Sequence, residues 1–391
     1  MKGKEKLSQF PIELLEKPII ERINYFDNFK VNHPIISDLL GELMVDIFNK
    51  GNHSILYVFG PTGVGKTTLY NKVLEKLNDK EALNIKNNPG IIPFLGTRAI
   101  APESGNFDWK DFYIRTLEDL NEPLIHKKVL LKKEDELKYG AYHNDKSTKA
   151  YRKSIENALK YRNSSVFLID EAQHLAKIGS GKKLLNQMDV IKSLAAETGT
   201  LIVLFGTYGL QNFLNLSDQL SRRGKEFHFP RYRYNNEQER DLFVDILYTF
   251  FAHLPMKMEK EEIENKLLAH SDFFYERSLG CIGILKDWIA RTYRLSLLNG
   301  YEDRLIIDNF YNTALTVSQC LTIAEEITNG EKQQEENEEQ RLLLLNKIGM
   351  DPFQSEPEKG SKVNNNKETK QKKRVGERKP KRDQVGVDKY A

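Results

Sequence analysis

Short apolar runs alternate with amphipathic stretches as far as Tyr234. The apolar runs, which predict buried strands, occupy 55–59, 91–95, 166–169, 201–205 and 226–229. Helical patterns separate most of them, at 67–77, 108–120, 149–161 and 184–196. Strands that are apolar throughout and alternate with helices are typical of a parallel sheet with both faces covered. The pattern therefore predicts an α/β fold.

After Tyr234 the strand signals stop. Asn235, Asn236 and Glu237 open a helical region, because Asn favours helix caps and acids favour the first turn. Helical segments are predicted at 239–254, 260–269, 282–299 and 304–327. We expect a small all-helical domain there, followed from about residue 355 by a disordered tail poor in apolar residues.

Composition excludes some classes of protein. The net charge of the chain is +3, and residues 361–391 alone carry +7 (eleven Lys/Arg, four Asp/Glu). The remaining chain therefore carries −4. It has no global positive field that would attract nucleic acid. No apolar run approaches the roughly 20 residues that span a bilayer. Cys281 and Cys320 have neither metal-ligand nor disulfide spacing, so a cytoplasmic location is the simplest.

A complete glycine-rich motif, G-x-x-x-x-G-K-[ST], joins the first predicted strand to the first predicted helix. It comprises Gly60, Pro61, Thr62, Gly63, Val64, Gly65, Lys66 and Thr67. Glycines let backbone N–H groups converge on phosphate oxygens, and the helix directs its positive end to them. We expect Lys66 at the β- and γ-phosphates, Thr67 at Mg²⁺, and Thr68 beside them. A chance glycine turn does not explain a full motif in this context.

Asp170 and Glu171 end the third predicted strand, at the edge where ligands collect in such sheets. Asp170 is expected to hold the metal, directly or through water, and Glu171 to polarise the attacking water. A solvated acidic pair is the alternative. The acid after Asp170 favours hydrolysis over binding alone. Thr207, after the fourth predicted strand, is a candidate partner for that water or for the γ-phosphate.

Three basic residues are candidates for contacting phosphate charge. Arg222 and Arg223 precede the fifth predicted strand, where an arginine can act on a neighbouring subunit's site; the sequence does not choose between them, and solvated surface arginines are the alternative. Lys286 begins a helix of the all-helical domain and is a candidate γ-phosphate sensor or a structural lysine. His143 and His174 lack partners at metal spacing.

Together these motifs resemble AAA+ ATPases, and within them the transposition regulators of the TnsC/TniB type, with MuB proteins as more distant relatives. The string D-E-A-Q-H-L from Asp170 is typical there, as are Arg22-Ile23, His33-Pro34 and the N-K-I-G-M-D-P-F run at 346–353. The resemblance covers residues 10–355. It implies an N-terminal segment packing on the core (1–50), a P-loop AAA+ core with helices on both faces (51–234), a helical lid (235–330), and a linker with a basic tail (331–391).

The resemblance also implies a function. Such proteins use ATP and Mg²⁺ to form rings or helical filaments on double-stranded DNA and then recruit a transposase to the target, and hydrolysis disassembles the filament. Partners would be DNA without sequence preference, further copies of the chain, a transposase and a target-selection protein, in a prokaryotic, nucleoid-associated setting. DNA contacts would come from the region after the second core strand, with Lys110 ranked first, then Lys127 and Lys128, and Arg98.

Alternatives remain open at this point. The lysines also fit a solvated, mixed-charge surface, because Glu134, Asp135 and Glu136 follow at once. A helicase-loader or replication-initiator ATPase, and a signalling NTPase acting on protein partners without DNA, are competing functions. Residues 132–154 look like an insertion without an assigned role. The basic run 370–382 fits either DNA or docking on a transposase or targeting subunit.

Overall fold

The computed structural model describes residues 9–49, 51, 53–103, 105–128, 148–176, 181–211, 224–256, 263–300, 307–334 and 338–350. The chain divides into two compact units, Met1–Glu335 and Glu336–Ala391. Several predicted features lie outside the described residues: Arg222, Arg223, the basic run 370–382 and the first portion of the 132–154 stretch.

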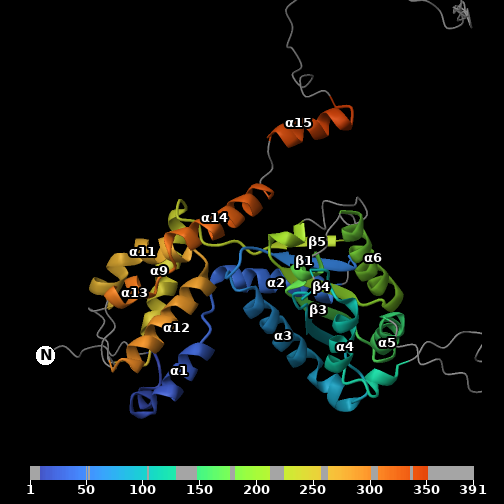
Figure 1. Ribbon diagram of the computed structural model, residues 1–391, viewed down its shortest axis with the longest axis horizontal. Coiled ribbons are helices and arrows are strands. Elements are labelled where there is room, and N and C mark those ends of the chain that lie inside the picture. The colour runs from blue at the N-terminus through green and yellow to red at the C-terminus, as the bar shows by residue number, and fades with distance from the viewer. Residues whose placement is uncertain are drawn as a thin grey trace, which may run out of the picture. The chain divides into compact units, whose positions relative to one another are not determined.

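Five parallel strands form the sheet of the first unit (Figure 1). They are β1 (Ile55–Phe59), β2 (Phe94–Arg98), β3 (Val166–Asp170), β4 (Leu201–Gly206) and β5 (Gly224–His228), in the order β2-β3-β4-β1-β5. The register pairs Phe59 with both Gly206 and His228, and Arg98 with Asp170. The carboxyl ends of the strands therefore meet at one edge, as predicted from the sequence.

β2 begins three residues later than the predicted run 91–95, at Phe94. Pro93 has no N–H to give to a strand ladder. The N–H of Ile92 donates to the Arg162 carbonyl, 2.8 Å away, just after a helix rather than in a strand. The regular strand therefore starts only after Pro93, although Ile91 and Ile92 continue its apolar pattern.

Helices cover both faces of the sheet, which confirms the predicted fold class. One face carries α4 (Trp109–Asp119), α5 (Thr148–Tyr161) and α6 (Gly181–Thr198), and the other carries α2 (Pro34–Phe48) and α3 (Lys66–Asn87). In β1, Tyr57 and Phe59 pack with the first set, and Leu56 and Val58 with the second, because successive strand side chains point to opposite faces. All four are at most 1% exposed, which explains why the strand is apolar throughout.

A second hydrophobic cluster holds the C-terminal helical region together. The helices are α9 (Glu237–Ala252), α11 (Ser271–Ser278), α12 (Ile282–Leu298), α13 (Ile307–Thr313) and α14 (Val317–Lys332), with the short turns η6 (Ile263–Leu267) and η7 (Leu268–His270). The rings of Phe274, Trp288 and Phe310 meet with centroids 5.0 to 5.9 Å apart. Elsewhere the short turns are η1 (Ile12–Glu16), η2 (Ile125–Lys127), η4 (Ala172–Ala176) and η5 (Tyr208–Leu210).

From residue 307 on, the helix predicted at 304–327 is divided into α13 and α14. α13 ends at Thr313, and Thr316 starts α14 with a capping box: its hydroxyl accepts from the N–H of Gln319, and its own N–H donates to the Gln319 side chain. The T-x-x-Q signal of this box is present in the sequence. The apolar periodicity across the break concealed it.

The N-terminal segment is shared between the cluster on one face of the sheet and the cluster of the C-terminal helical region. α2 packs on the sheet, whereas α1 (Ile19–Asn28) packs on the C-terminal helical region through Phe26. The packing predicted for residues 1–50 as one domain stays a prediction. Arg22, buried, donates from Nε and Nη2 to the Pro255 carbonyl at 3.2 and 2.8 Å. His33 shares a 3.0 Å hydrogen bond with the Tyr232 hydroxyl, and burial lowers its pKa to about 4.

The second unit contains α15 (Glu338–Lys347), on which Leu342, Leu343 and Leu344 are exposed. Within the described ranges, no helix of either unit combines the length and apolar character that crossing a membrane requires.

Candidate nucleotide-binding site

The glycine-rich loop lies between β1 and α3, where the sequence predicted it. Gly65, with φ of +115°, precedes the first residue of α3 in a left-handed conformation that favours glycine. Gly60 is needed for a different reason: a Cβ there would lie 2.1 Å from the carbonyl oxygen of Phe229. The loop thus passes directly against the segment after β5 and delivers Lys66 and Thr67 to the first turn of α3.

The Lys66 ammonium folds back onto its own loop. Nζ donates to the carbonyl of Gly60 at 3.0 Å and to that of Pro61 at 2.6 Å. Burial lowers the pKa of Lys66 to about 8, against the opposing influence of Glu171 and, less strongly, Asp170. In this conformation the loop carbonyls bind the Lys66 ammonium group, which the motif is expected to direct to phosphate oxygens.

Thr67 and Asp170 meet across the site. The Thr67 hydroxyl donates to Asp170 Oδ2 at 3.1 Å, and Asp170 Oδ1 accepts from the N–H of Glu171 at 2.9 Å. Burial raises the pKa of the Asp170 carboxyl, and these hydrogen bonds oppose the rise. A hydroxyl and a carboxylate oxygen side by side are ligands that Mg²⁺ accepts. Both residues line a cavity of about 400 Å³ that leaves space beside them. The pair therefore fits the predicted metal.

Glu171 leaves β3 with a φ of +55°, a left-handed conformation that few non-glycine residues adopt. Such strain, on the order of 1–3 kcal/mol, accumulates at functional sites. Its carboxylate accepts from Gln173 Nε2 at 2.5 Å and from Arg98 Nη2 at 3.4 Å, and His174 Nε2 lies 3.9 Å away. The described neighbours of the Glu171 carboxylate are therefore three polar side chains, those of Gln173, Arg98 and His174.

Thr207 follows β4, next to β3 in the sheet. Its N–H donates to Gln173 Oε1 at 3.2 Å, and its hydroxyl accepts from the N–H of Gly209 at 3.4 Å, which caps η5. Thr207 is therefore linked to Glu171 through Gln173. Neither Gln173 nor the contact of Arg98 with Glu171 was identified from the sequence, although Gln173 lies in the D-E-A-Q-H-L string.

The lid contacts the glycine-rich loop through the start of α12. The N–H groups of Gly283 and Ile284 both donate to the Gly63 carbonyl, at 2.7 and 3.2 Å. Lys286, the predicted γ-phosphate sensor, instead donates to the carbonyl of Asp27 in α1, 2.7 Å away, and burial lowers its pKa. Its sensor role stays a prediction.

The candidate DNA contacts are not equivalent. Lys110 is exposed near the Tyr151 ring, with Nζ 6.0 Å from its centroid. Lys127 is exposed in η2. Lys128 forms a 3.1 Å ion pair with Glu122, which also pairs with Arg162, and so belongs to a structural cluster. Their contacts with DNA stay predictions.

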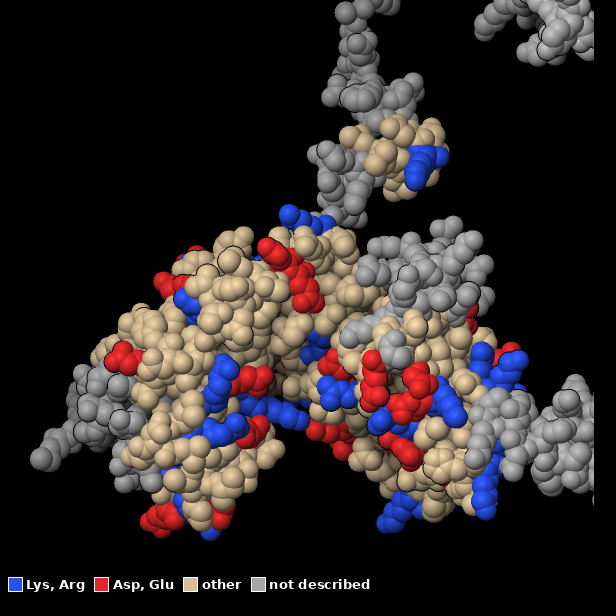
Figure 2. All heavy atoms as spheres, viewed as in Figure 1, with Lys and Arg blue, Asp and Glu red and all other residues tan. Residues whose placement is uncertain are grey.

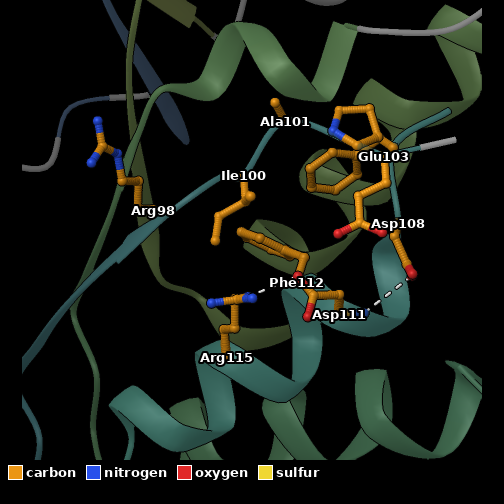
Figure 3. A pocket seen from close by; sticks show the side chains of 10 residues that line it. Arg98, Ile100, Ala101, Glu103, Asp108, Asp111, Phe112 and Arg115 are labelled. Atoms are coloured by element: carbon orange, nitrogen blue, oxygen red, sulfur yellow. Dashed lines mark hydrogen bonds and ion pairs between the residues drawn. The ribbon is translucent and has the colours of Figure 1, made fainter. Parts of the chain in front are cut away.

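The start of α4, the helix that carries Lys110, borders a cavity lined by both acidic and basic side chains. The loop after β2 and the start of α4 line a cavity of about 400 Å³, with Ile100 directed towards Phe112 and an acidic rim that includes Glu103 and Asp108 (Figure 3). Arg98 points away from this rim, which agrees with its contact to Glu171. On the face in Figure 2, the described Lys and Arg side chains are interspersed with Asp and Glu. Any basic DNA-binding surface here is therefore local.

The strand order, the glycine-rich loop before α3 and the acidic end of β3 are the features of an AAA+ P-loop fold. Residues 49–214 match the family described as AAA domain. Among the described residues, no group of three or more His, Cys, Asp or Glu side chains is placed to hold a metal ion. Mg²⁺ usually binds one or two protein groups together with phosphate oxygens and water, and the pair of Thr67 and Asp170 is of this kind.

Comparison with known proteins gives distant likenesses. No curated protein sequence matches the chain. A Walker-type ATPase of Pyrococcus abyssi is 17% identical with a TM-score of 0.42, covering 76% of this chain and 74% of that one. ORC2 of Aeropyrum pernix, in ADPNP–ADP complexes, is 14% identical with a TM-score of 0.47, covering 75% and 72%. ORC1 of Aeropyrum pernix, in complex with DNA, is 16% identical with a TM-score of 0.45, covering 72% and 65%.

Proposed function

We propose that the chain hydrolyses ATP with the help of Mg²⁺. The observation that supports this most is the 3.1 Å contact between the Thr67 hydroxyl and Asp170 beside the glycine-rich loop. Two oxygen ligands, a phosphate-binding lysine and an acid at the end of the same strand are the parts that phosphoryl transfer to water needs.

Each residue then has a defined task. Lys66 leaves the carbonyls of its loop and binds the β- and γ-phosphates, while Thr67 and Asp170 hold Mg²⁺, which neutralises phosphate charge when bound. Glu171 takes a hydrogen bond from the attacking water, and Thr207 lies at the same edge to contact that water or the γ-phosphate. Arg222 or Arg223 of a neighbouring copy completes the site in trans.

We further propose that ATP binding serves assembly on double-stranded DNA, in a transposition regulator of the TnsC/TniB type. Support comes from the resemblance carried by the Asp170–Leu175 string and by Arg22 and His33. The buried hydrogen bonds of these two residues join α1 to Pro255 and the start of α2 to Tyr232. Copies joined through ATP would place Lys110 repeatedly along one DNA backbone, so that weak phosphate contacts add. The assembled chain would recruit a transposase and a target-selection protein, and hydrolysis would release the assembly.

Electron microscopy of the full chain with ATP, Mg²⁺ and plain duplex DNA tests this proposal. We expect rings or filaments on DNA for the wild type, none for Lys66→Ala, and longer-lived ones for Glu171→Gln, which should bind ATP but hydrolyse it poorly. A chain that hydrolyses ATP yet never assembles on DNA would refute the transposition function and favour a switch acting on protein partners. Assembly only at particular sequences or at branched DNA would favour a replication-initiator or helicase-loader function.

A further inference from the structure

The side chain of Gln173 connects the carboxyl ends of two neighbouring strands. Its Nε2 donates to Glu171 Oε2 at 2.5 Å, and its Oε1 accepts from the N–H of Thr207 at 3.2 Å. β3 and β4 are paired in the sheet, so this amide spans the gap between the residues that follow each strand. One short side chain thus joins the candidate water-polarising acid to the backbone of the candidate sensor.

The orientation of this amide is chemically determined. A backbone N–H can only donate, so the atom of Gln173 that faces Thr207 must be the oxygen. The amide nitrogen must then face Glu171, whose carboxylate it approaches as a donor. Orientations of Gln side chains are assigned from such networks, and here a donor at one end fixes both ends.

The space around the amide of Gln173 is restricted by two glycines, Gly206 and Gly209. A Cβ at Gly206 would lie 2.6 Å from Gln173 Oε1, so the last residue of β4 leaves room for the amide by having no side chain. A Cβ at Gly209 would lie 3.4 Å from the Cβ of Gln173. The left-handed φ of Glu171 turns the chain sharply after β3, and Gln173 follows two residues later in η4.

We propose that Gln173 is a positioning residue for ATP hydrolysis, which holds Glu171 Oε2 in place relative to the end of β4. The inference rests on the proposed ATPase function. With Oε2 engaged by the amide, the attacking water is left to Oε1, on the side of the weaker Arg98 contact. Movement of Thr207, the residue that senses phosphate or water, is transmitted to Glu171 through two hydrogen bonds.

The test compares steady-state ATP hydrolysis by the wild type, Gln173→Met and Gln173→Glu between pH 6 and 9. Methionine keeps the length of the side chain and removes both hydrogen bonds. We expect its kcat to fall about 10- to 100-fold, the effect of losing one hydrogen bond to a charged group, while KM and nucleotide binding change less than about twofold, as for an interaction that acts in the transition state.

Gln173→Glu provides a readout that a merely structural role would not move. While both carboxylates are ionised they repel, and activity is low. As the pH falls, a proton shared between them restores a donor towards Glu171, so the activity of this variant relative to wild type recovers. The other charged or titratable groups that act on Glu171 are Arg98, His174, Lys66 and Asp170. All four are present in the wild type and in both variants.

The possible results separate the inference from the function it rests on. A wild type that binds ATP but does not hydrolyse it refutes the proposed function. A wild type that hydrolyses ATP, with Gln173→Met equally active or Gln173→Glu following the wild-type pH profile, overturns the role of Gln173 alone. Should methionine impair folding, judged by thermal unfolding, the pH recovery of Gln173→Glu still decides the question.

Discussion

Replacing Arg98 by methionine removes the guanidinium that contacts Glu171 and keeps an unbranched side chain at the end of β2. In the structure the two oxygens of Glu171 are both engaged, Oε1 by Arg98 at 3.4 Å and Oε2 by Gln173 at 2.5 Å. The attacking water requires one of these oxygens, and the Arg98 contact is the longer and more exposed. We therefore expect that Arg98 restrains hydrolysis and that its loss increases the rate.

The size of the effect follows from the exposure of the pair. The side chains of Arg98 and Glu171 are 65% and 31% exposed, and ion pairs of this kind contribute about 0.2–1 kcal/mol. If the pair must separate before Glu171 binds water, its loss raises kcat by about 1.4- to 5-fold. For the same reason, the free energy of unfolding should change by less than about 1 kcal/mol.

Phosphate release at saturating ATP and Mg²⁺, without DNA, measures this rise. Arg98→Lys is the matched control, because it keeps the charge and should stay near the wild-type rate. A lower kcat for Arg98→Met would show that Arg98 assists the reaction, and equal rates would show that the ion pair does not restrain Glu171. Because Arg98 is also a candidate DNA contact, the salt dependence of DNA binding should be compared; losing one phosphate contact reduces its slope by about one.

Two further predictions concern the lid and the glycine-rich loop. Gly330→Ala in α14 should lower the midpoint of urea unfolding, because a Cβ there would lie 2.2 Å from the Tyr208 ring and overpacking costs about 1–3 kcal/mol. Gly41→Ala in α2, with nothing within 4 Å, should instead stabilise by about 0.5–1 kcal/mol; equal shifts would mean that α14 does not rest on Tyr208. Because burial lowers the pKa of Lys66 to about 8, this lysine is already charged at pH 7 but must take up a proton to bind phosphates at pH 9. Titration calorimetry in buffers of different ionisation enthalpy should therefore show proton uptake linked to Lys66 on ATP binding at pH 9 but not at pH 7; Lys66-independent uptake, or none, would contradict this.

The parts of the site that the sequence predicts are those that depend on short stretches of chain. The glycine-rich loop brings Lys66 and Thr67 to the start of α3 because strand, loop and helix are contiguous. Asp170 reaches Thr67 because an apolar strand ending in an acid belongs in the middle of a parallel sheet, where carboxyl ends collect. The register between neighbouring strands, which no single strand determines, is the further information needed to place Asp170 beside Thr67.

The contacts that were missed join segments distant in sequence. Gln173 connects to Thr207, 34 positions away, and Arg98 connects to Glu171, 73 positions away. From the sequence alone, a glutamine after an acidic pair is indistinguishable from any other polar residue. Only the pairing of β3 with β4 places Gln173 beside Thr207. Likewise, the apolar face of α1 indicates a helix that packs, but not whether it packs on the sheet or on the lid.

The C-terminal helical region contacts the candidate nucleotide-binding site and the segment after β4 at two separate places. At one, the start of α12 donates two hydrogen bonds to Gly63 in the glycine-rich loop. At the other, the end of α14 lies against Tyr208, and both oxygens of Glu331 accept from Arg231 at 3.0 and 3.2 Å. A rigid shift of the C-terminal helical region would therefore displace both the glycine-rich loop and the segment after β4.

Tyr208 directly follows Thr207, and Thr207 is joined to Glu171 through Gln173. The end of α14 is thus connected to the residue that we propose to polarise water through Tyr208, Thr207 and Gln173 in turn. The chain beyond α14 leads at once into the second unit, which begins at Glu336. Gly330→Ala, by lifting α14 from Tyr208, should change the rate of the proposed ATP hydrolysis without altering any residue that contacts the nucleotide, and phosphate release at saturating ATP measures this change.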